Sequence, residues 1–319
     1  MKTDDSILKG YRYIFGPVSS RRLGMSLGVD LMPHKTCTLN CVYCECGKTT
    51  HLVKTRKEYV PTKDVIGELK DYLEKTPELD YITFSGSGEP TLHSGIGDVI
   101  RFLKSGYSQY KIALLTNGTL FYLPEVRKAV MDADLIIASV DAGTEETFQK
   151  VNRPHPGLKF DRMSEGLVQL GKERKNQLWM EFFIVPGIND NTYELSETKK
   201  LIERIQADKT QLNILDRPGT ESWVMAADEQ TQKRIKDYFG HSETISKTKP
   251  VQGRQADEGE LDKSILATIR RRPSTLEDLS QTLGVHQKKV WQHICMLLDH
   301  GIVEKNSMPR GEFFIIKKD

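Results

Sequence analysis

Short apolar runs alternate with amphipathic segments over roughly the first two thirds of the chain. The runs are nearly continuous and rich in β-branched residues, which is typical of parallel strands covered on both faces. They predict six strands, at Ser26–Leu31, Tyr81–Ser85, Lys111–Thr116, Leu135–Val140, Leu178–Val185 and Gln211–Leu215.

Apolar residues at helical spacing lie between these runs and predict the helices that connect the strands. The expected helices are Lys63–Glu74, Ile96–Lys104, Pro124–Met131, Asp161–Arg174 and Tyr193–Ile205. Alternating strands and helices place the strands parallel in one sheet. The pattern therefore predicts an α/β fold, and periodicity alone leaves open a doubly wound sheet or an incomplete barrel.

The pattern changes after residue 240. Residues 241–260 are polar and show no periodicity, so we expect a linker there. Beyond it, three helical patterns precede two short apolar runs, Ile302–Lys305 and Phe313–Ile316, with a turn expected at Asn306–Gly311. Such an order is typical of a winged helix-turn-helix. We therefore expect a core domain at 1–240, a linker at 241–260 and a winged helix-turn-helix domain at 261–319.

Composition narrows the class of protein. The chain has 319 residues, with 46 Lys and Arg against 44 Asp and Glu, a net charge of +2 that gives no general reason to invoke nucleic acid. No apolar run approaches the roughly 20 residues of a membrane span. The first residues are polar and acidic, unlike a signal peptide. We expect a cytoplasmic protein without a membrane partner.

The cysteines point to metal or redox chemistry. Four of the 5 cysteines crowd into one short segment, which is a poor disulfide framework. Cys37, Cys41 and Cys44 form a C-x3-C-x2-C array in a loop after the first expected strand. Three thiolates on such a loop would hold three irons of a [4Fe–4S] cluster and leave the fourth iron open for another ligand.

Structural zinc is the alternative that the cysteines alone leave open. Zinc needs four closed ligands, and Cys46, His34 or His51 would have to supply the fourth. Otherwise Cys46 has no assigned role, and Cys295 is expected to be a packed, inert thiol.

The residues around the array resemble the radical SAM superfamily over roughly residues 14–220. In that family C-x3-C-x-aromatic-C ligates the cluster, and Tyr43 fills the aromatic position. The segment Ser85–Thr91 resembles the family's Gly-Gly-Glu-Pro element. Further polar or Gly-rich segments follow the third, fourth and fifth expected strands, at the strand ends where such folds bind ligands. These segments are Thr116–Gly118, Ser139–Ala142 and Val185–Asp190.

Two segments narrow the resemblance. Phe15–Gly24 and Cys44–Gly47 look like a branch of Fe–S oxidoreductases near the wyosine-tRNA and molybdenum-cofactor synthases. The implied fold is a partial (β/α)6 radical SAM barrel. The implied cofactors are a [4Fe–4S] cluster on Cys37, Cys41 and Cys44, and S-adenosyl-L-methionine, whose amino and carboxylate groups chelate the fourth iron. Reductive cleavage to a 5′-deoxyadenosyl radical needs an external electron donor of the flavodoxin or ferredoxin type.

The resemblance also implies residues that bind S-adenosylmethionine. Glu89 would accept a hydrogen bond from the methionyl ammonium, and Gly86 and Gly88 would let the backbone approach. Ser139 and Asp141 would bond the ribose or the methionyl group. They could instead belong to the N-cap region of a following helix.

The remaining expected contacts are looser. Gly187 and Ile188 would lie along the adenine, and Asn117 is either a ligand or a turn residue. Arg153 would meet the cofactor carboxylate, because arginine binds carboxylates through two parallel bonds. Arg21, Arg22 and Arg217 are expected either to meet an anionic substrate or to form surface ion pairs.

The C-terminal unit carries ten Lys and Arg against seven Asp and Glu, a net charge of +3. Lys288 and Lys289 open its third helix and Arg310 lies on the expected wing, which permits nucleic-acid binding. Winged helices also bind peptides and proteins.

Three functions compete on these observations. The first is a radical SAM enzyme acting on nucleic acid or peptide. The others are an iron–sulfur redox-sensing DNA-binding regulator and a zinc-stabilised binding protein. The Gly-Ser-Gly-Glu-Pro segment favours the enzyme, because a sensor needs no S-adenosylmethionine site.

Overall fold

The computed structural model describes residues 11–20, 22–240, 242–244 and 261–317. Arg21 and positions 245–260 of the expected linker lie outside these residues.

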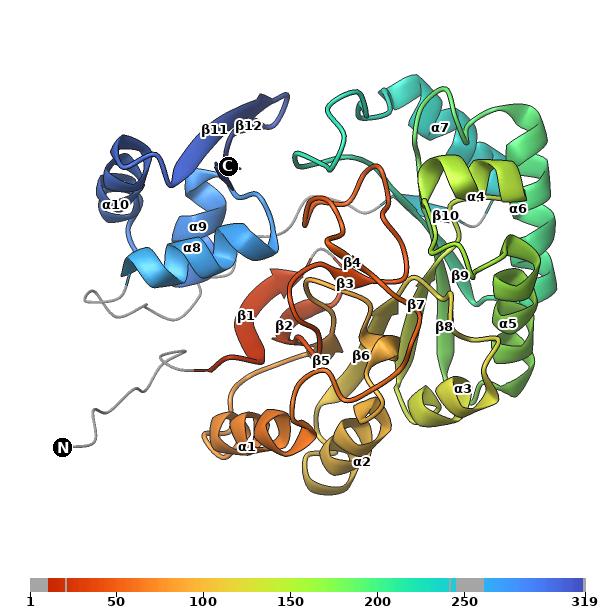
Figure 1. The fold of residues 1–319 in the computed structure, drawn as a ribbon, viewed down its shortest axis with the longest axis horizontal. Coiled ribbons are helices and arrows are strands. Elements are labelled where there is room, and N and C mark those ends of the chain that lie inside the picture. The colour runs from red at the N-terminus through yellow and green to blue at the C-terminus, as the bar shows by residue number, and fades with distance from the viewer. Residues whose placement is uncertain (1–10, 21, 241, 245–260, 318–319) are drawn as a thin grey trace.

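One curved sheet forms the centre of the larger part of the molecule (Figure 1). Its strands are β1 (Ile14–Ser20), β2 (Gly24–Val29), β5 (Tyr81–Phe84), β6 (Lys111–Thr116), β7 (Leu135–Ser139), β8 (Gln177–Phe183), β9 (Lys209–Asn213) and β10 (Ser242–Thr244). They lie side by side in this order, and every neighbouring pair is parallel except β1 and β2 at one edge. The six expected strands are confirmed as β2 and β5 to β9.

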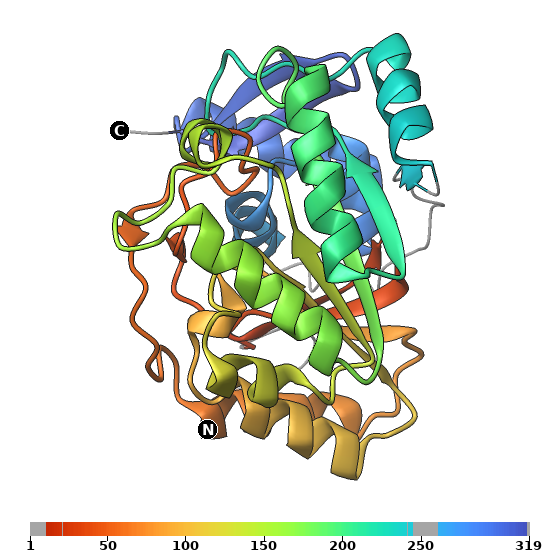
Figure 2. The ribbon, with the colours of Figure 1, turned by 90° about the vertical axis from the view of Figure 1, so that its right-hand side faces the viewer.

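Helices connect the strands and cover the outer face of the sheet (Figure 2). They are α1 (Thr62–Leu73), α2 (Ile96–Gly106), α3 (Pro124–Val130), α4 (Glu145–Val151), α5 (Phe160–Glu173), α6 (Thr192–Ile205) and α7 (Glu229–Phe239), with a short 3-10 turn at Pro90–Leu92. In α2, Ile96, Val99 and Leu103 are buried on one face, as the apolar spacing predicts. The architecture is an incomplete (β/α)6 barrel.

The periodicity does not predict β1, α4, α7 or β10. Gly16 and Pro17 interrupt β1, which forms the sheet edge and shifts its register against β2 between Phe15 and Val18. Helix α4 has seven residues, and α7 buries Ile235 as its one fully covered side chain. Strand β10 spans three residues. Short or mostly polar elements carry too few apolar positions to show a period.

The C-terminal unit contains α8 (Leu261–Arg271), α9 (Leu276–Leu283), α10 (Gln287–Asp299) and the antiparallel pair β11 (Val303–Met308) and β12 (Gly311–Ile316). Its apolar side chains, Ile265, Val290 and Ile294 among them, form a cluster of their own. The turn expected at Asn306–Gly311 is shorter in the structure, because β11 continues to Met308 and β12 begins at Gly311, which leaves Pro309 and Arg310 between the two strands. The assignment as a winged helix-turn-helix stays a prediction.

Candidate active site

The cysteine loop lies between β2 and α1, at the carboxyl end of the sheet. Two short parallel strands, β3 (Thr36–Cys37) and β4 (His51–Leu52), close its neck. Its tip is held by the C-terminal end of α4, since Val42 N–H donates to Val151 O at 2.9 Å and Asn40 N–H donates to Asn152 O at 3.0 Å. The loop therefore has a defined shape that depends on a segment more than 100 positions away.

Each of the three array cysteines accepts a hydrogen bond from a different side chain. Asn117 Nδ2 lies 3.5 Å from Cys37 Sγ. Asn152 Nδ2 lies 3.5 Å from Cys41 Sγ. The third contact, from Lys35 Nζ to Cys44 Sγ, measures 3.1 Å. The three donors come from different parts of the fold and converge on three sulfurs.

Cys46 makes the opposite kind of contact. Its thiol donates to the carbonyl oxygens of Arg271, 3.0 Å away, and Gly86, 3.7 Å away. A thiol that donates to carbonyls keeps its proton, whereas a sulfur that accepts from N–H groups is suited to carry negative charge. Cys46 thus differs from the three array sulfurs in being a hydrogen-bond donor.

Burial sets the acidity of the thiols. It raises the pKa of Cys37 to about 12 and also raises the pKa of Cys41. Hydrogen bonding from Cys46, together with the charge of Lys35, lowers the pKa of Cys44. Buried thiols of this kind become thiolates when a metal coordinates them. Among the described residues, no three His, Cys, Asp or Glu side chains are arranged to hold a single metal ion.

The Gly-Ser-Gly-Glu-Pro segment packs directly against the cysteine loop. A Cβ at Gly88 would lie 2.2 Å from Thr36 O, and one at Gly86 would lie 2.2 Å from the Asp30 carboxylate. Asp30 also accepts from Ser87 N–H at 3.1 Å and Ser87 Oγ at 2.8 Å. Both positions therefore require glycine, because a side chain would collide with these neighbouring atoms.

Glu89 links the ends of two neighbouring strands. Its side chain is 2% exposed. Oε1 accepts from Thr91 N–H at 3.0 Å, Thr91 Oγ1 at 2.6 Å and Thr116 Oγ1 at 2.6 Å, and Oε2 accepts from Asn117 N–H at 2.8 Å. Burial raises the pKa of Glu89 despite these bonds. Oε2 holds one donor and retains a lone pair for another.

Asn117 is more than a turn residue. Its Nδ2 donates to Thr38 Oγ1 at 2.8 Å as well as to Cys37, and its Oδ1 accepts from Thr119 Oγ1 at 2.7 Å. The side chain thus holds the loop after β6 against the first array cysteine.

Asp141 is a buried hub beneath the cysteine loop. It accepts hydrogen bonds from the Tyr43 hydroxyl, from Asn152 Nδ2 at 2.8 Å and from Phe183 N–H at 2.9 Å. Tyr43 also stacks on Phe183 with ring centroids 3.8 Å apart. Burial raises the pKa of Asp141 to about 6. The aromatic position of the array is therefore fixed by both packing and a charged acceptor.

The N-cap alternative for Ser139 and Asp141 is wrong, because Thr144 is the residue that caps α4 and accepts from Thr147 N–H. Ser139 ends β7 beside Glu181 of β8, so it lies at the expected edge of the sheet.

Gly187 and Ile188 line a hollow of about 560 Å³ between the starts of α4 and α6. None of the other expected cofactor residues lines this hollow. Ile188 also packs in the apolar cluster that contains Val42 and Tyr43, which connects the hollow to the cysteine loop.

The expected arginines are engaged in ion pairs. Arg153 pairs with Glu221, and Arg22 pairs with Glu181. Arg217, 6% exposed, donates to Pro273 O at 2.6 Å and to Asp278 at 2.7 Å, and its guanidinium lies 3.7 Å from Glu45 of the cysteine loop.

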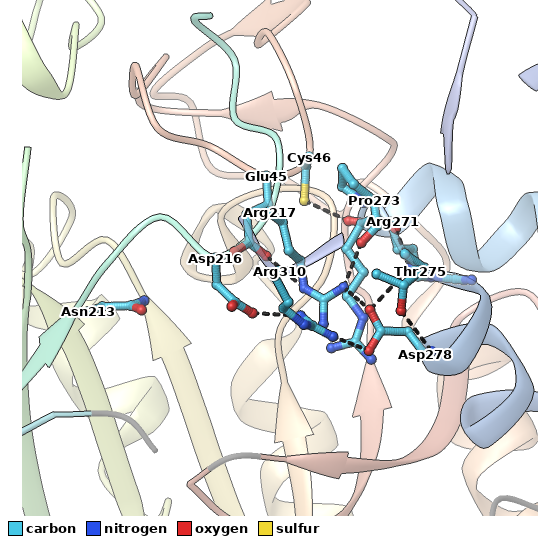
Figure 3. A network of polar contacts seen from close by, with 12 residues as sticks. Glu45, Cys46, Asn213, Asp216, Arg217, Arg271, Pro273, Thr275, Asp278 and Arg310 are labelled. Atoms are coloured by element: carbon cyan, nitrogen blue, oxygen red, sulfur yellow. Dashed lines mark hydrogen bonds and ion pairs between the residues drawn. The ribbon is translucent and has the colours of Figure 1, made fainter. Parts of the chain in front are cut away.

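Arg217 belongs to a network that joins the C-terminal unit to the barrel (Figure 3). Arg310 pairs with Asp278 of its own unit and with Asp216 beyond β9. Met308 at the end of β11 packs against the apolar cluster that includes Leu215 and Val42. Arg310 is thus paired with two carboxylates, which corrects its expected availability to nucleic acid.

Two residues of the site could not be predicted from the sequence patterns. Lys35 and Asn152 carry no family motif, and their contact with the array depends on how two loops meet in space. The one available signal for Asn152 is its place beside Arg153 at the end of a polar helix.

Comparison with known proteins identifies the superfamily of the chain. The family model of the radical SAM superfamily matches residues 31–198, and the chain belongs to this superfamily. It is an enzyme of that class, and its cofactors are a [4Fe–4S] cluster and S-adenosyl-L-methionine.

Relatives place the chain among the UPF0026 proteins. One of them, from Methanocaldococcus jannaschii, is 31% identical over 237 residues, 74% of this chain and 73% of that protein. A protein of Brachyspira hyodysenteriae named GTPase Obg is 32% identical over 295 residues, and the match spans 92% of this chain but 43% of that protein.

Among solved structures, a radical SAM methyltransferase from Sphaerobacter thermophilus shares the fold. Its TM-score is 0.54 at 14% identity, over 69% of this chain and 65% of that one. No helix in the described part of the chain has the length and apolar character of a membrane span.

Proposed function

We propose that Cys37, Cys41 and Cys44 each bind one iron of the [4Fe–4S] cluster and leave the fourth iron to S-adenosylmethionine. One observation carries this assignment. Each of these three sulfurs accepts an N–H hydrogen bond, whereas Cys46 donates its thiol hydrogen to carbonyls. N–H donors orient thiolate ligands and stabilise their charge.

The cofactors, when bound, supply an electron that cleaves the S–C5′ bond and gives a 5′-deoxyadenosyl radical. The protein's own residues position them. Glu89 Oε2 accepts from the methionyl ammonium, while the backbone of Gly86 and Gly88 approaches the methionine moiety. Asp141 holds Tyr43, and through it the cysteine loop, in place.

The nucleoside half of S-adenosylmethionine would then lie toward the next strand ends. Ser139 is proposed for the ribose, and Gly187 with Ile188 for the adenine. Arg153 is proposed for the cofactor carboxylate, and this role requires it to leave Glu221.

We further propose that the substrate is a nucleic acid or a peptide and that it approaches over the C-terminal unit. Lys288 at the start of α10 is exposed, while Arg310 is held in ion pairs. The electron comes from an external donor of the flavodoxin or ferredoxin type. The contact of Arg271 O in α8 with the Cys46 thiol joins the C-terminal unit to the cysteine loop and supports delivery of a substrate by this unit.

The test is anaerobic reconstitution with iron and sulfide, followed by dithionite and S-adenosylmethionine. We expect 5′-deoxyadenosine from the wild-type protein. Cys37→Ala, Cys41→Ala and Cys44→Ala should each lose the [4Fe–4S] absorption and the product. The matched controls Cys46→Ala and Cys295→Ala should keep the cluster. A Cys41→Ala protein that retains iron while Cys46→Ala loses it would show that the ligand set is wrong.

A further inference from the structure

Lys35 is a buried lysine inside the cysteine loop. It is 4% exposed and adopts a left-handed backbone conformation with φ of 55°, which is uncommon for a residue other than glycine. Its N–H donates to Ser87 O at 2.9 Å, and its carbonyl accepts from Thr50 N–H at 3.2 Å and His51 N–H at 3.1 Å. The main chain of Lys35 thus ties the Gly-Ser-Gly-Glu-Pro segment to both arms of the loop.

The ammonium of Lys35 points at sulfur. Its Nζ lies 3.1 Å from Cys44 Sγ. Within the described residues, no carboxylate lies at ion-pair distance from it. The polar partner of this buried ammonium is therefore a cysteine sulfur and not a carboxylate.

A buried cation without a counter-ion is costly, so such groups are normally paired. The acidic groups that act on the other two array sulfurs are Glu89 at Cys37 and Asp141 at Cys41. Both add negative charge to the site, and Lys35 stands against them at Cys44. A [4Fe–4S] cluster with three thiolate ligands carries a net negative charge, and reduction makes it more negative by one unit.

We infer that Lys35 is the charge partner of the cluster and raises its reduction potential. This inference rests on the proposed ligand set. The step concerned is the transfer of one electron from the external donor to the cluster, in which the cluster is reduced, the donor is oxidised, no bond breaks and Lys35 keeps its proton. The ammonium offsets part of the added negative charge, because attraction between close charges is strong where water is excluded. Lys35 is thus a positioning residue for electron entry.

The experiment compares redox titrations of reconstituted proteins in the absence of S-adenosylmethionine. The electron paramagnetic resonance signal of the reduced cluster monitors each titration. Lys35→Met removes the charge and keeps the length of the side chain. We expect its midpoint potential to become more negative, enough for at least a tenfold lower ratio of reduced to oxidised cluster at the wild-type midpoint. For a one-electron couple that ratio corresponds to 59 mV.

Two further variants separate charge from other effects. Lys35→Arg retains the cation, so its midpoint should stay close to that of the wild type. The ratio of reduced to oxidised cluster at the wild-type midpoint should change by no more than a few-fold. Lys48→Met removes an exposed lysine of the same loop and should leave the midpoint unchanged. If Lys35→Met folds without loading iron, Lys35→Gln takes its place, because glutamine keeps an N–H donor without the charge, and the same negative shift is expected.

A fully loaded Lys35→Met or Lys35→Gln protein with the wild-type midpoint overturns the inference. So does an unchanged midpoint combined with weaker S-adenosylmethionine binding, which would assign Lys35 to the cofactor carboxylate instead. A different observation would contradict the proposed ligand set, namely that the protein retains iron when an array cysteine is replaced. The two failures are therefore distinguishable by iron content and midpoint.

Discussion

Arg217 and Asp278 form a buried ion pair of 2.7 Å between the segment after the last barrel strand and the first turn of α9. Burial alone would raise the pKa of Asp278, yet Arg217 and Arg310 lower it overall. Asp278 also closes a capping box with Thr275 at the start of α9. One carboxylate thus serves a helix cap and the contact between the two parts of the chain.

Arg217→Met should destabilise the full-length protein by about 2 kcal/mol, because Pro273 O loses its charged donor and Asp278 keeps Arg310 as its remaining partner. Urea unfolding measures the change. Arg234→Met is the matched control, since Arg234 and Asp190 form a more exposed ion pair that should contribute less than about 1 kcal/mol. Equal losses in both variants would contradict a special role for Arg217.

Glu89→Gln should weaken binding of S-adenosylmethionine about tenfold or more while iron content stays unchanged. The reason is that a carboxylate binds an ammonium through a charge-assisted bond, roughly twice as strong as a neutral one. Isothermal titration of the reconstituted protein measures the affinity. Glu58→Gln is a matched control, because Glu58 accepts from Thr62 N–H and Oγ1 as Glu89 does from Thr91, but lies exposed. Wild-type affinity in Glu89→Gln would remove Glu89 from the cofactor site.

Asp141 should make the iron-free protein less stable as pH rises. Its pKa is about 6 in the folded chain and about 3.9 in an unfolded one, so the folded state binds more protons between these values. The stabilising contribution of Asp141 to the free energy of unfolding is fully present below about pH 4 and is lost as pH rises through about 6. Above that pH it no longer changes.

Urea unfolding between pH 4 and pH 7 tests this, with Asp141→Asn expected to lack the decline. The destabilisation caused by Asp141→Asn should therefore be largest at the acidic end. Asp132→Asn, at an exposed position, should follow the wild-type curve. Parallel curves for wild type and Asp141→Asn would be evidence against the shifted pKa.

Lys288→Ala combined with Lys289→Ala tests the nucleic-acid version of the proposed substrate. If both contact phosphates, the salt dependence of RNA or DNA binding by the full chain should flatten by about two units of log–log slope. Fluorescence anisotropy at several salt concentrations gives that slope. Lys63→Ala with Lys70→Ala removes the same charge from α1 and should leave it unchanged. No salt-dependent affinity in the wild type would favour a peptide substrate.

The six barrel strands could be predicted because buried parallel strands are apolar on both faces and leave continuous runs in the sequence. Strand β1 and helix α7 could not be predicted from the sequence. Strand β1 lies at the edge of the sheet, and α7 fully buries one side chain, Ile235. The array, Glu89 and Asp141 were found from motifs at strand ends. Lys35 and Asn152 were not, because a donor to sulfur is defined by the meeting of distant loops. The ion pair of Arg310 with Asp216 could not be predicted for the same reason, because the two residues lie 94 positions apart.

The hydrogen bond from Cys46 to the carbonyl of Arg271 spans 225 positions. During synthesis at about 5–20 residues per second, roughly 10 to 45 s separate the appearance of these two residues. The barrel strands can pair within that time, since their contacts are closer along the chain. Until α8 has emerged, the nascent chain carries its cysteine loop without the cover that the C-terminal unit later provides.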